Sequence, residues 1–315
     1  MKTLNTVYTS LSTRRRYEVW FVRLGLADMS GAWWFRYLLM NPGRSGCVGN
    51  PRGSPVQVWA TWFPKQGRPQ SFIQGYPLDG LELSAPGESP FLFHAGDNQI
   101  NETSCRGALD IDRHRITWDL HYRSSLHATL SSRGWIGFSR TPHSHATFAG
   151  QIKLDDRIFD GDPLGFGLQG HNCGYRHRTF WRWAHACFPA ASSRPAAIEA
   201  LAYDMPLGLV FRKAVLFHEG KRYVFRGLRE SVNRDAFAWS FSAASKDGWQ
   251  LGAAFDGSGL SLHRLPYLKT DCSGDFEVVN NSFANAVVRL KRPGGGVEEL
   301  TTSGGAVLEM GGKRN

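Results

Sequence analysis

Apolar and polar residues alternate at every second position along nearly the whole chain, and this pattern constrains the fold more than any other feature. Between residues 116 and 122, the apolar side chains are Ile116, Trp118, Leu120 and Tyr122, with polar residues between them. A period of two is typical of β-strands with one face turned to a core. Similar runs occupy residues 148–154, 237–241, 249–255 and 286–290.

Short turn signals separate these runs. Acidic-glycine pairs stand at 79–80, 160–161, 219–220, 247–248 and 256–257, where they predict hairpin turns. No stretch of a dozen residues keeps a helical apolar stripe free of Gly and Pro. We therefore predict an all-β protein with little helix, whose strands form antiparallel sheets.

The length of 315 residues exceeds what one hydrophobic core usually supports, so two domains are expected. We place them at residues 1–178 and 179–315. Closing a sheet into a barrel removes its exposed edges, and a barrel of about eight strands is wide enough for one small ligand. Aromatic residues are abundant, with 20 Phe, 11 Trp and 9 Tyr, which suggests walls against which a ligand stacks.

The formal net charge is +10, a balance that can attract nucleic acid, anionic lipid or an acidic partner. The basic residues are scattered, apart from the run 14–16, and no nucleic-acid-binding pattern accompanies them. We expect no nucleic-acid partner. No segment approaches the roughly 20 apolar residues of a membrane helix. A cytoplasmic protein is expected; peripheral contact with a membrane surface stays open, as does the oligomeric state.

Five cysteines are widely spaced, with no C-x-x-C pair: Cys47, Cys105, Cys173, Cys187 and Cys272. An odd number without close pairs predicts reduced thiols and supports neither a disulfide framework nor a zinc knuckle. Cys173 and Cys187 are candidate nucleophiles only if a His lies beside them, and a small buried side chain is the commoner role.

Two stretches carry a resemblance to a known superfamily. Residues 17–21 (YEVWF) are similar to an H-E-W-W-Y opening strand. Residues 150–154 (GQIKL), a turn at 156–161 and residues 167–174 (GLQGHNCG) resemble a strand, turn and D-H-N-W-G element. Residues 181–185 (WRWAH) look like the aromatic strand that opens a second barrel. The superfamily contains tocopherol cyclases and carotenoid 1,2-hydratases (hydroxyneurosporene synthases), with lipocalin-like pericyclases among its relatives.

The resemblance implies two lipocalin-like antiparallel β-barrel or sandwich domains packed together around a site near their junction. Its D-H-N-W-G element departs from the pattern here, because Gly170 and Cys173 stand where the family has Asp and Trp. If that Trp shields a carbocation in the hydratases, its loss points to a different substrate or reaction. The candidate residues that the resemblance singles out are Glu18, His171 and Asp204 as catalytic groups and Trp20, Asn172, Trp181, Trp183 and Tyr203 as substrate-binding groups.

Each candidate has a structural alternative. A buried carboxyl beside aromatic rings can have a raised pKa and donate a proton, which fits Glu18 or Asp204. Glu18 can equally pair with an Arg inside the barrel, and Asp204 can cap the following turn. Strand alternation puts Tyr203 and Asp204 on opposite faces, so without a bulge only one of them faces a cavity. His171, oriented by Asn172, is either an acid–base group or a link between backbone groups.

No cofactor motif is present, and no metal site is predicted. His143-Ser144-His145 has the spacing of two ligands on one strand face, but no third ligand is identifiable, and Pro142 favours a solvated loop. The sequence contains no phosphate-binding glycine loop, dinucleotide fingerprint or G-x-S-x-G elbow. Cofactors are therefore expected to be absent.

The function that fits these observations is a cofactor-independent cyclase or hydratase, an isomerase or lyase acting on a hydrophobic small-molecule substrate of isoprenoid or polyene type. Positioning of the substrate would supply much of the rate enhancement. The alternative is a non-catalytic carrier of a lipid or pigment. A carrier should have an almost wholly apolar cavity, whereas an enzyme should show convergent polar groups with perturbed pKa values. A basic module docking on membrane or nucleic acid is a third class.

Overall fold

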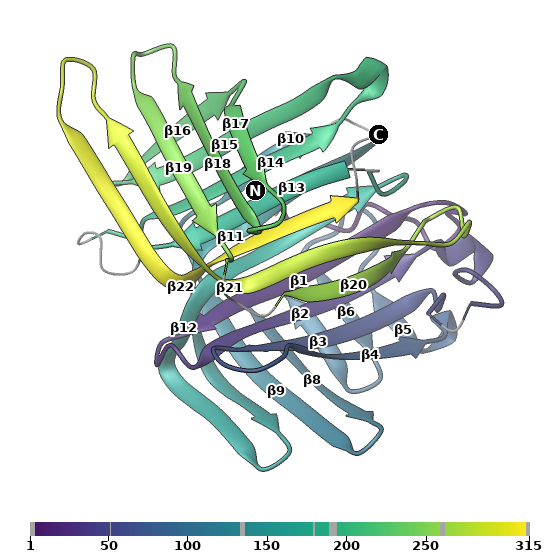
Figure 1. Ribbon diagram of the computed structural model, residues 1–315. Coiled ribbons are helices and arrows are strands. Elements are labelled where there is room, and N and C mark those ends of the chain that lie inside the picture. The colour runs from purple at the N-terminus through teal and green to yellow at the C-terminus, as the bar shows by residue number, and fades with distance from the viewer. Residues whose placement is uncertain are drawn as a thin grey trace.

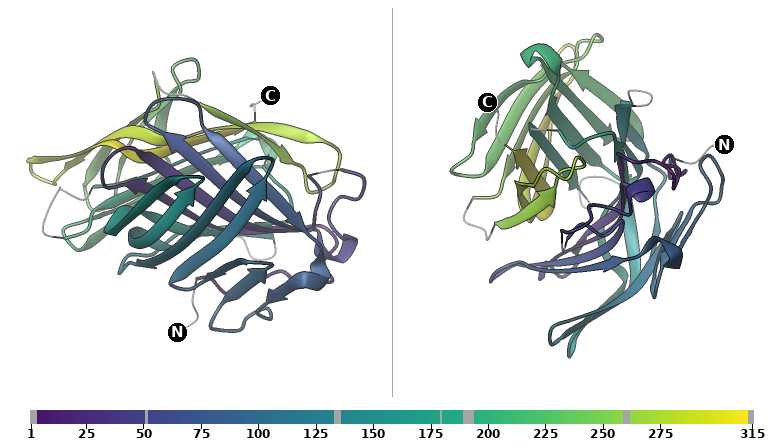
Figure 2. Two further views of the ribbon diagram at one scale, coloured as in Figure 1. Left: turned by 90° about the horizontal axis from the view of Figure 1, so that it is seen from below. Right: turned by 90° about the vertical axis from the view of Figure 1, so that its right-hand side faces the viewer.

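The computed structural model describes residues 4–50, 52–132, 136–178, 180–188, 194–258 and 262–312. In this part of the chain, antiparallel strands form two sheets, and the only helical pieces are the short 3-10 turns η1 (Pro42–Arg44), η2 (Leu78–Gly80) and η4 (Pro206–Gly208). Figures 1 and 2 show the sheets packed on each other, the first coloured purple to teal and the second green to yellow. The predicted all-β class is confirmed.

The first sheet is a nearly closed barrel with the strand order β4-β3-β2-β1-β12-β11-β9-β8-β7-β6-β5, and β10 pairs with β11. Its strands are β1 (Tyr17–Leu26), β2 (Gly31–Met40), β3 (Val56–Pro64), β4 (Gln70–Tyr76), β5 (Leu81–Leu83), β6 (Leu92–Ala95), β7 (Asn98–Asn101), β8 (Ser104–Ile111), β9 (His114–Arg123), β10 (Ala128–Ser132), β11 (Gly137–Leu154) and β12 (Arg157–Gly174).

The second sheet has the order β16-β15-β14-β13-β22-β21-β19-β18-β17, and β20 pairs with β21. Its strands are β13 (Phe180–Cys187), β14 (Ala197–Asp204), β15 (Val210–His218), β16 (Lys221–Arg226), β17 (Arg229–Asn233), β18 (Ala238–Ala244), β19 (Gln250–Asp256), β20 (His263–Leu268), β21 (Asp275–Lys291) and β22 (Val297–Gly312). A division into domains 1–178 and 179–315 stays a proposal, because the two sheets share packed side chains.

Each sheet encloses a core made by its own side chains. In β1, Trp20, Val22 and Leu24 point into the first barrel and are fully buried in one large cluster. The alternation expected for 116–122 is confirmed in β9, where Trp118 and its apolar partners join that cluster. A second cluster around Trp239 fills the second sheet. The two interiors are thus occupied by the protein's own aromatic and aliphatic groups.

The opposite faces of the central strands meet at a junction between the sheets. Phe21 and Trp34 of the first sheet share a buried cluster there with Trp183 and Tyr203 of the second. Arg23 locks the junction, because its fully buried guanidinium donates hydrogen bonds to backbone carbonyls of Ser282, Gly304, Gly305 and Ala306. Strands buried on both faces explain why residues 31–40 read as one continuous apolar run.

A disulfide joins the two halves, so the prediction of five reduced cysteines is wrong. Cys47, just after η1, is bonded to Cys272 in the loop between β20 and β21, with 5.5 Å between their Cα atoms. Cys105, Cys173 and Cys187 are free and buried. Sequence spacing gave no hint, because the partners are 225 residues apart. The cytoplasmic location stays a prediction.

Two local predictions are also corrected. Asp160-Gly161 is not a hairpin turn but lies inside β12; the turn between β11 and β12 falls at Asp155-Asp156, where Asp155 adopts a positive φ of 53°. Residues 143–145 are not a solvated loop. They belong to β11, at a point where its register with β12 shifts, and His145 is buried. The strand tolerates Pro142 because ladder pairing is interrupted there. No helix of the described residues is long and apolar enough to span a membrane.

Candidate functional site

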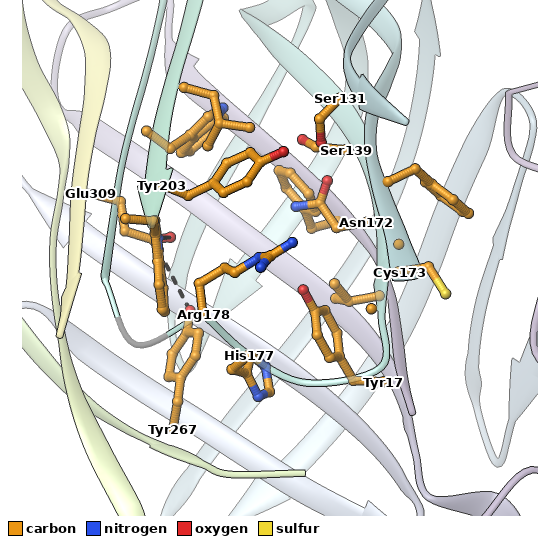
Figure 3. A pocket seen from close by; sticks show the side chains of 18 of the residues that line it. Tyr17, Ser131, Ser139, Asn172, Cys173, His177, Arg178, Tyr203, Tyr267 and Glu309 are labelled. Atoms are coloured by element: carbon orange, nitrogen blue, oxygen red, sulfur yellow. Dashed lines mark hydrogen bonds between the residues drawn. The ribbon is translucent and has the colours of Figure 1, made fainter. Parts of the chain in front are cut away.

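A pocket with a cavity volume of about 140 Å³ opens at the junction between the two sheets, outside both filled barrel interiors. Strands β1, β2, β10, β11 and β12 of the first sheet supply one wall, and β13, β14, β20 and β22 of the second supply the other. Figure 3 shows polar and aromatic side chains from both sheets converging on this space. Its aromatic lining includes Phe21, Trp34, Phe138, Trp181, Trp183 and Tyr203.

Alternate residues of a strand point to opposite faces, and this decides which candidates reach the pocket. On β12, Asn172 lies opposite Val19 of β1 on the junction face, and its half-buried side chain lines the pocket. His171 lies opposite Trp20 on the barrel face. Successive strand residues point to opposite faces, so the His-Asn pair is divided between two environments. Asn172 Oδ1 is buried without a hydrogen-bond partner.

Glu18, Trp20 and His171 lie together in the first barrel and do not line the junction pocket. Glu18 and His171 form a fully buried hydrogen-bonded pair, with His171 Nε2 lying 2.8 Å from Glu18 Oε1. The backbone N–H groups of Tyr8 and Thr9 donate to the same carboxylate at 2.9 and 2.7 Å. Trp20 stacks on the His171 ring with 4.8 Å between centroids.

This arrangement ties the N-terminal segment to the barrel. His171 Nδ1 also donates to the Leu4 carbonyl at 2.7 Å, so both ring nitrogens are used. The inward carboxylate considered for Glu18 is therefore present, but its partner is a histidine and not the Arg that the sequence suggested. The catalytic role proposed for Glu18 and His171 gains no support from their position.

Three candidates from the second half do line the pocket: Trp181, Trp183 and Tyr203. Trp181 and Trp183 follow each other at i, i+2 on β13, which gives their indoles the same face. Asp204 does not line the pocket; its Oδ1 accepts a hydrogen bond from the backbone N–H of Phe180 at 3.2 Å. As the alternation requires, Tyr203 is the member of its pair that faces the cavity.

The departures at Gly170 and Cys173 have a structural reason. A Cβ at Gly170 would lie 2.2 Å from the Phe21 ring, so glycine leaves room for that ring at the pocket wall. Cys173 Sγ turns away from the pocket, as Figure 3 shows, toward Thr9 Oγ1 and Arg16 Nη1. Burial raises the pKa of Cys173 and of Cys187 to about 12, so neither thiol supplies a thiolate at neutral pH.

The acid of the pocket is Glu309 of β22, which the sequence did not single out. Trp181 Nε1 donates to its Oε1 at 2.9 Å, and Asn280 Nδ2 donates to its Oε2 at 3.2 Å. The carboxyl is 7% exposed, and burial raises its pKa above the ordinary value although nearby Arg36 and these donors oppose the shift. Glu309 is a carboxyl on an aromatic wall with an elevated proton affinity.

A second buried carboxyl lies deeper in the junction. Glu199 of β14 accepts hydrogen bonds from Trp183 Nε1 at 2.9 Å and from Thr141 Oγ1 at 2.6 Å. Burial raises the pKa of Glu199 to about 7. It does not line the pocket, so it supports Trp183 from behind.

Cations outnumber acids around the pocket. Among the residues that the structure describes, its lining contains Arg36, Arg176 and Arg178 but only one carboxyl, Glu309. Burial lowers the pKa of His177 to about 3, and this ring is neutral at physiological pH. Burial also raises the pKa values of Tyr17 and Tyr267, whose hydroxyls stay protonated. The pocket is therefore an aromatic chamber with a positive field.

Glu309 and Arg36 each had a signal that sequence reasoning did not use. Each is a lone charge inside an apolar strand, in the runs 306–310 (AVLEM) and 33–40 (WWFRYLLM). An isolated charge in a strand with buried neighbours on both sides is costly unless it has a purpose. Among the described residues, no group of three or more His, Cys, Asp or Glu gathers as a metal site would require.

No protein-family model matches the sequence, and no curated protein matches it. Solved structures do match in fold. CghA with Sch210972 superposes with a TM-score of 0.61 at 11% identity, covering 99% of this chain and 94% of that one. Kievitone hydratase from Nectria haematococca gives 0.55 at 11% identity, covering 99% and 98%. The chain therefore has the same two-sheet, lipocalin-like fold as these two proteins over its whole length, as the resemblance implied.

Proposed function

We propose that this protein is a cofactor-independent cyclase or hydratase that binds an apolar isoprenoid or polyene in the junction pocket and protonates it with Glu309. The observation that carries the proposal is the position of Glu309, a buried carboxyl of raised pKa on a wall of aromatic rings. Alkene protonation needs a carboxyl of raised proton affinity beside a dry aromatic surface.

The roles follow from the geometry. Trp181 Nε1 holds one carboxyl oxygen of Glu309, and Asn280 Nδ2 holds the other, so the acid has a fixed direction. The proton passes from Glu309 to a substrate carbon, and the faces of Trp181, Trp183 and Tyr203 stabilise the resulting positive charge. Addition of water or of a second double bond, followed by loss of a proton to the Glu309 carboxylate, completes hydration or cyclisation.

The polar lining favours an enzyme over a carrier. Glu309, Arg36 and Asn172 converge on one cavity, whereas a carrier of a lipid or pigment needs little beyond apolar walls. The fold likeness to kievitone hydratase is consistent with hydration chemistry.

The test begins with the ligand. Mass spectrometry of extracts from the purified protein should identify a bound apolar molecule, and this molecule and a panel of linear isoprenoids and polyenes are then assayed for conversion. Glu309→Gln should lower turnover by about a hundredfold or more, because loss of a general acid costs at least that much, while binding persists. Glu299→Gln, a change at an exposed position of the same strand, is the matched control.

Turnover should also fall as pH rises through the raised pKa of Glu309, since only the protonated carboxyl donates. If the Glu309→Gln variant converted the substrate as fast as the unaltered protein, Glu309 would not be the proton donor. Tight binding without any conversion by the unaltered protein would favour the carrier instead.

A further inference from the structure

Arg36 is a buried cation without a counter-ion. It lies on β2, is 7% exposed, and its guanidinium carbon lies 4.5 Å from the ring centroids of both Trp59 and Tyr267. It makes no hydrogen bond or ion pair with any described residue, and its Nη1 is buried without a partner. A buried charge normally pairs, because its desolvation is otherwise uncompensated.

Other unused donors lie on the same wall. Trp34 precedes Arg36 by two residues on the same face of β2, and its Nε1 is also buried without a hydrogen-bond partner. Across the pocket, Arg178 has its guanidinium 4.8 Å from the Tyr203 ring centroid and pairs with no carboxylate of the described residues. Figure 3 shows the Arg178 guanidinium projecting into the space between Tyr203, Asn172 and Tyr17.

The charge of Arg36 acts on the pKa of the Glu309 carboxyl, but Arg36 forms no ion pair or hydrogen bond with it. Glu309 is the pocket's only carboxyl among the described lining residues, and it spends its oxygens on Trp181, Asn280 and Tyr267. Donors left free around a cavity are complementary to an acceptor that arrives with a ligand.

We propose that the molecule bound in the junction pocket carries an acidic oxygen group, of carboxylate or enolate type, which docks on Arg36 and Trp34 Nε1 with Arg178 adding charge. This inference rests on the proposed function, since it names the substrate class of the same pocket. The acidic group anchors one end of the molecule at β2. Arg36 stacks on Tyr267, whose hydroxyl contacts Glu309, so the anchor lies near the acid and selects which carbon of the apolar remainder meets it.

A matched pair of dyes separates the anchor from the pocket. The anion 1-anilinonaphthalene-8-sulfonate and the neutral N-phenyl-1-naphthylamine share one ring system and differ by the sulfonate. Their dissociation constants are measured by fluorescence titration for the unaltered protein, Arg36→Met, Arg36→Gln and Leu201→Trp. Leu201 lines the pocket on β14, and a Trp at this position reduces the space in it. Arg115→Met, at an exposed position far from the pocket, is the control for general loss of positive charge.

The anionic dye should bind at least about tenfold more tightly than the neutral dye, as expected for hydrogen bonds to a charged group. Arg36→Met should remove most of this preference and leave the neutral dye's affinity within about twofold. Arg115→Met should leave both affinities unchanged, and Leu201→Trp should weaken both. If Arg36→Met fails to fold, Arg36→Gln, which keeps polar donors and loses the charge, decides in its place.

An equal preference in the unaltered protein and the Arg36 variants would overturn the anionic anchor. The neutral dye would still respond to Leu201→Trp in that case, and the proposed function would stand. If Leu201→Trp changed the affinity of neither dye, the dyes would not bind in the junction pocket, and both proposals would be wrong.

Discussion

The interior of the first barrel and the junction between the sheets are both built from aromatic rings and a few charged groups, but they use their polar atoms differently. In the barrel, the Glu18 carboxylate meets His171 and two backbone N–H groups, so its charge is fully compensated. In the junction, Arg36 Nη1, Trp34 Nε1 and Asn172 Oδ1 have no partner. Trp33 Nε1 and Trp62 Nε1 in the barrel also lack a partner, so the contrast lies in the charged groups. A compensated charge holds a structure together, whereas an uncompensated charge beside a cavity indicates where a ligand of opposite charge belongs.

The largest effect is expected in the barrel. Glu18→Gln removes a fully buried carboxylate that His171 and the backbone N–H groups of Tyr8 and Thr9 contact, and breaking a buried charged network costs about 3–5 kcal/mol. Urea denaturation should show that loss of unfolding free energy, while dye binding in the junction persists under conditions where the variant is folded. Loss of junction binding without loss of stability would mean that Glu18 serves the pocket after all.

A smaller effect, dependent on pH, is expected from Glu199. The pKa of this carboxyl rises from an ordinary 4.5 to about 7 on folding, so the folded state binds the proton more tightly. Its contribution to stability is complete below pH 4.5 and is lost as pH rises through about 7, by about 3 kcal/mol in all. Glu199→Gln should flatten this part of the stability profile. An unchanged slope would mean that Glu199 ionises normally in the folded junction.

The smallest effect is expected from Arg36→Met. Because Arg36 has no counter-ion, its removal relieves a desolvation penalty and forfeits only its stacking on Trp59 and Tyr267. The unfolding free energy should change by about 1 kcal/mol or less, and a small increase agrees with this expectation as well as a small decrease does. If Arg36→Met lowered the unfolding free energy as much as Glu18→Gln does, Arg36 would be a structural residue, and the two regions would not differ in this respect.

Much of the fold could be predicted from sequence because strand alternation is a local property. The runs at 116–122 and 286–290 identified strands β9 and β21 correctly. The junction needed more, because strands such as β1 and β2 are buried on both faces and alternation no longer tells inside from outside. The chain could show that Glu18 and Trp20 share a face, but not that this face looks into a filled barrel.

The Cys47–Cys272 bond illustrates the same limit at long range. Its partners come from loops that approach only when the β20–β21 hairpin lies across the first sheet, and no spacing rule reports such a meeting. Arg36 and Glu309 were equally invisible as a pair, since they are 273 positions apart and belong to different sheets. Long-range packing, and not local pattern, assembled the site.

The most direct test of this account is a crystal structure of the protein with 1-anilinonaphthalene-8-sulfonate bound. The account predicts electron density for the rings between Trp181 and Phe21, with the sulfonate against Arg36 and both barrel interiors still filled by their own side chains. Density for the dye inside the first barrel, beside Trp20 and His171, would contradict it.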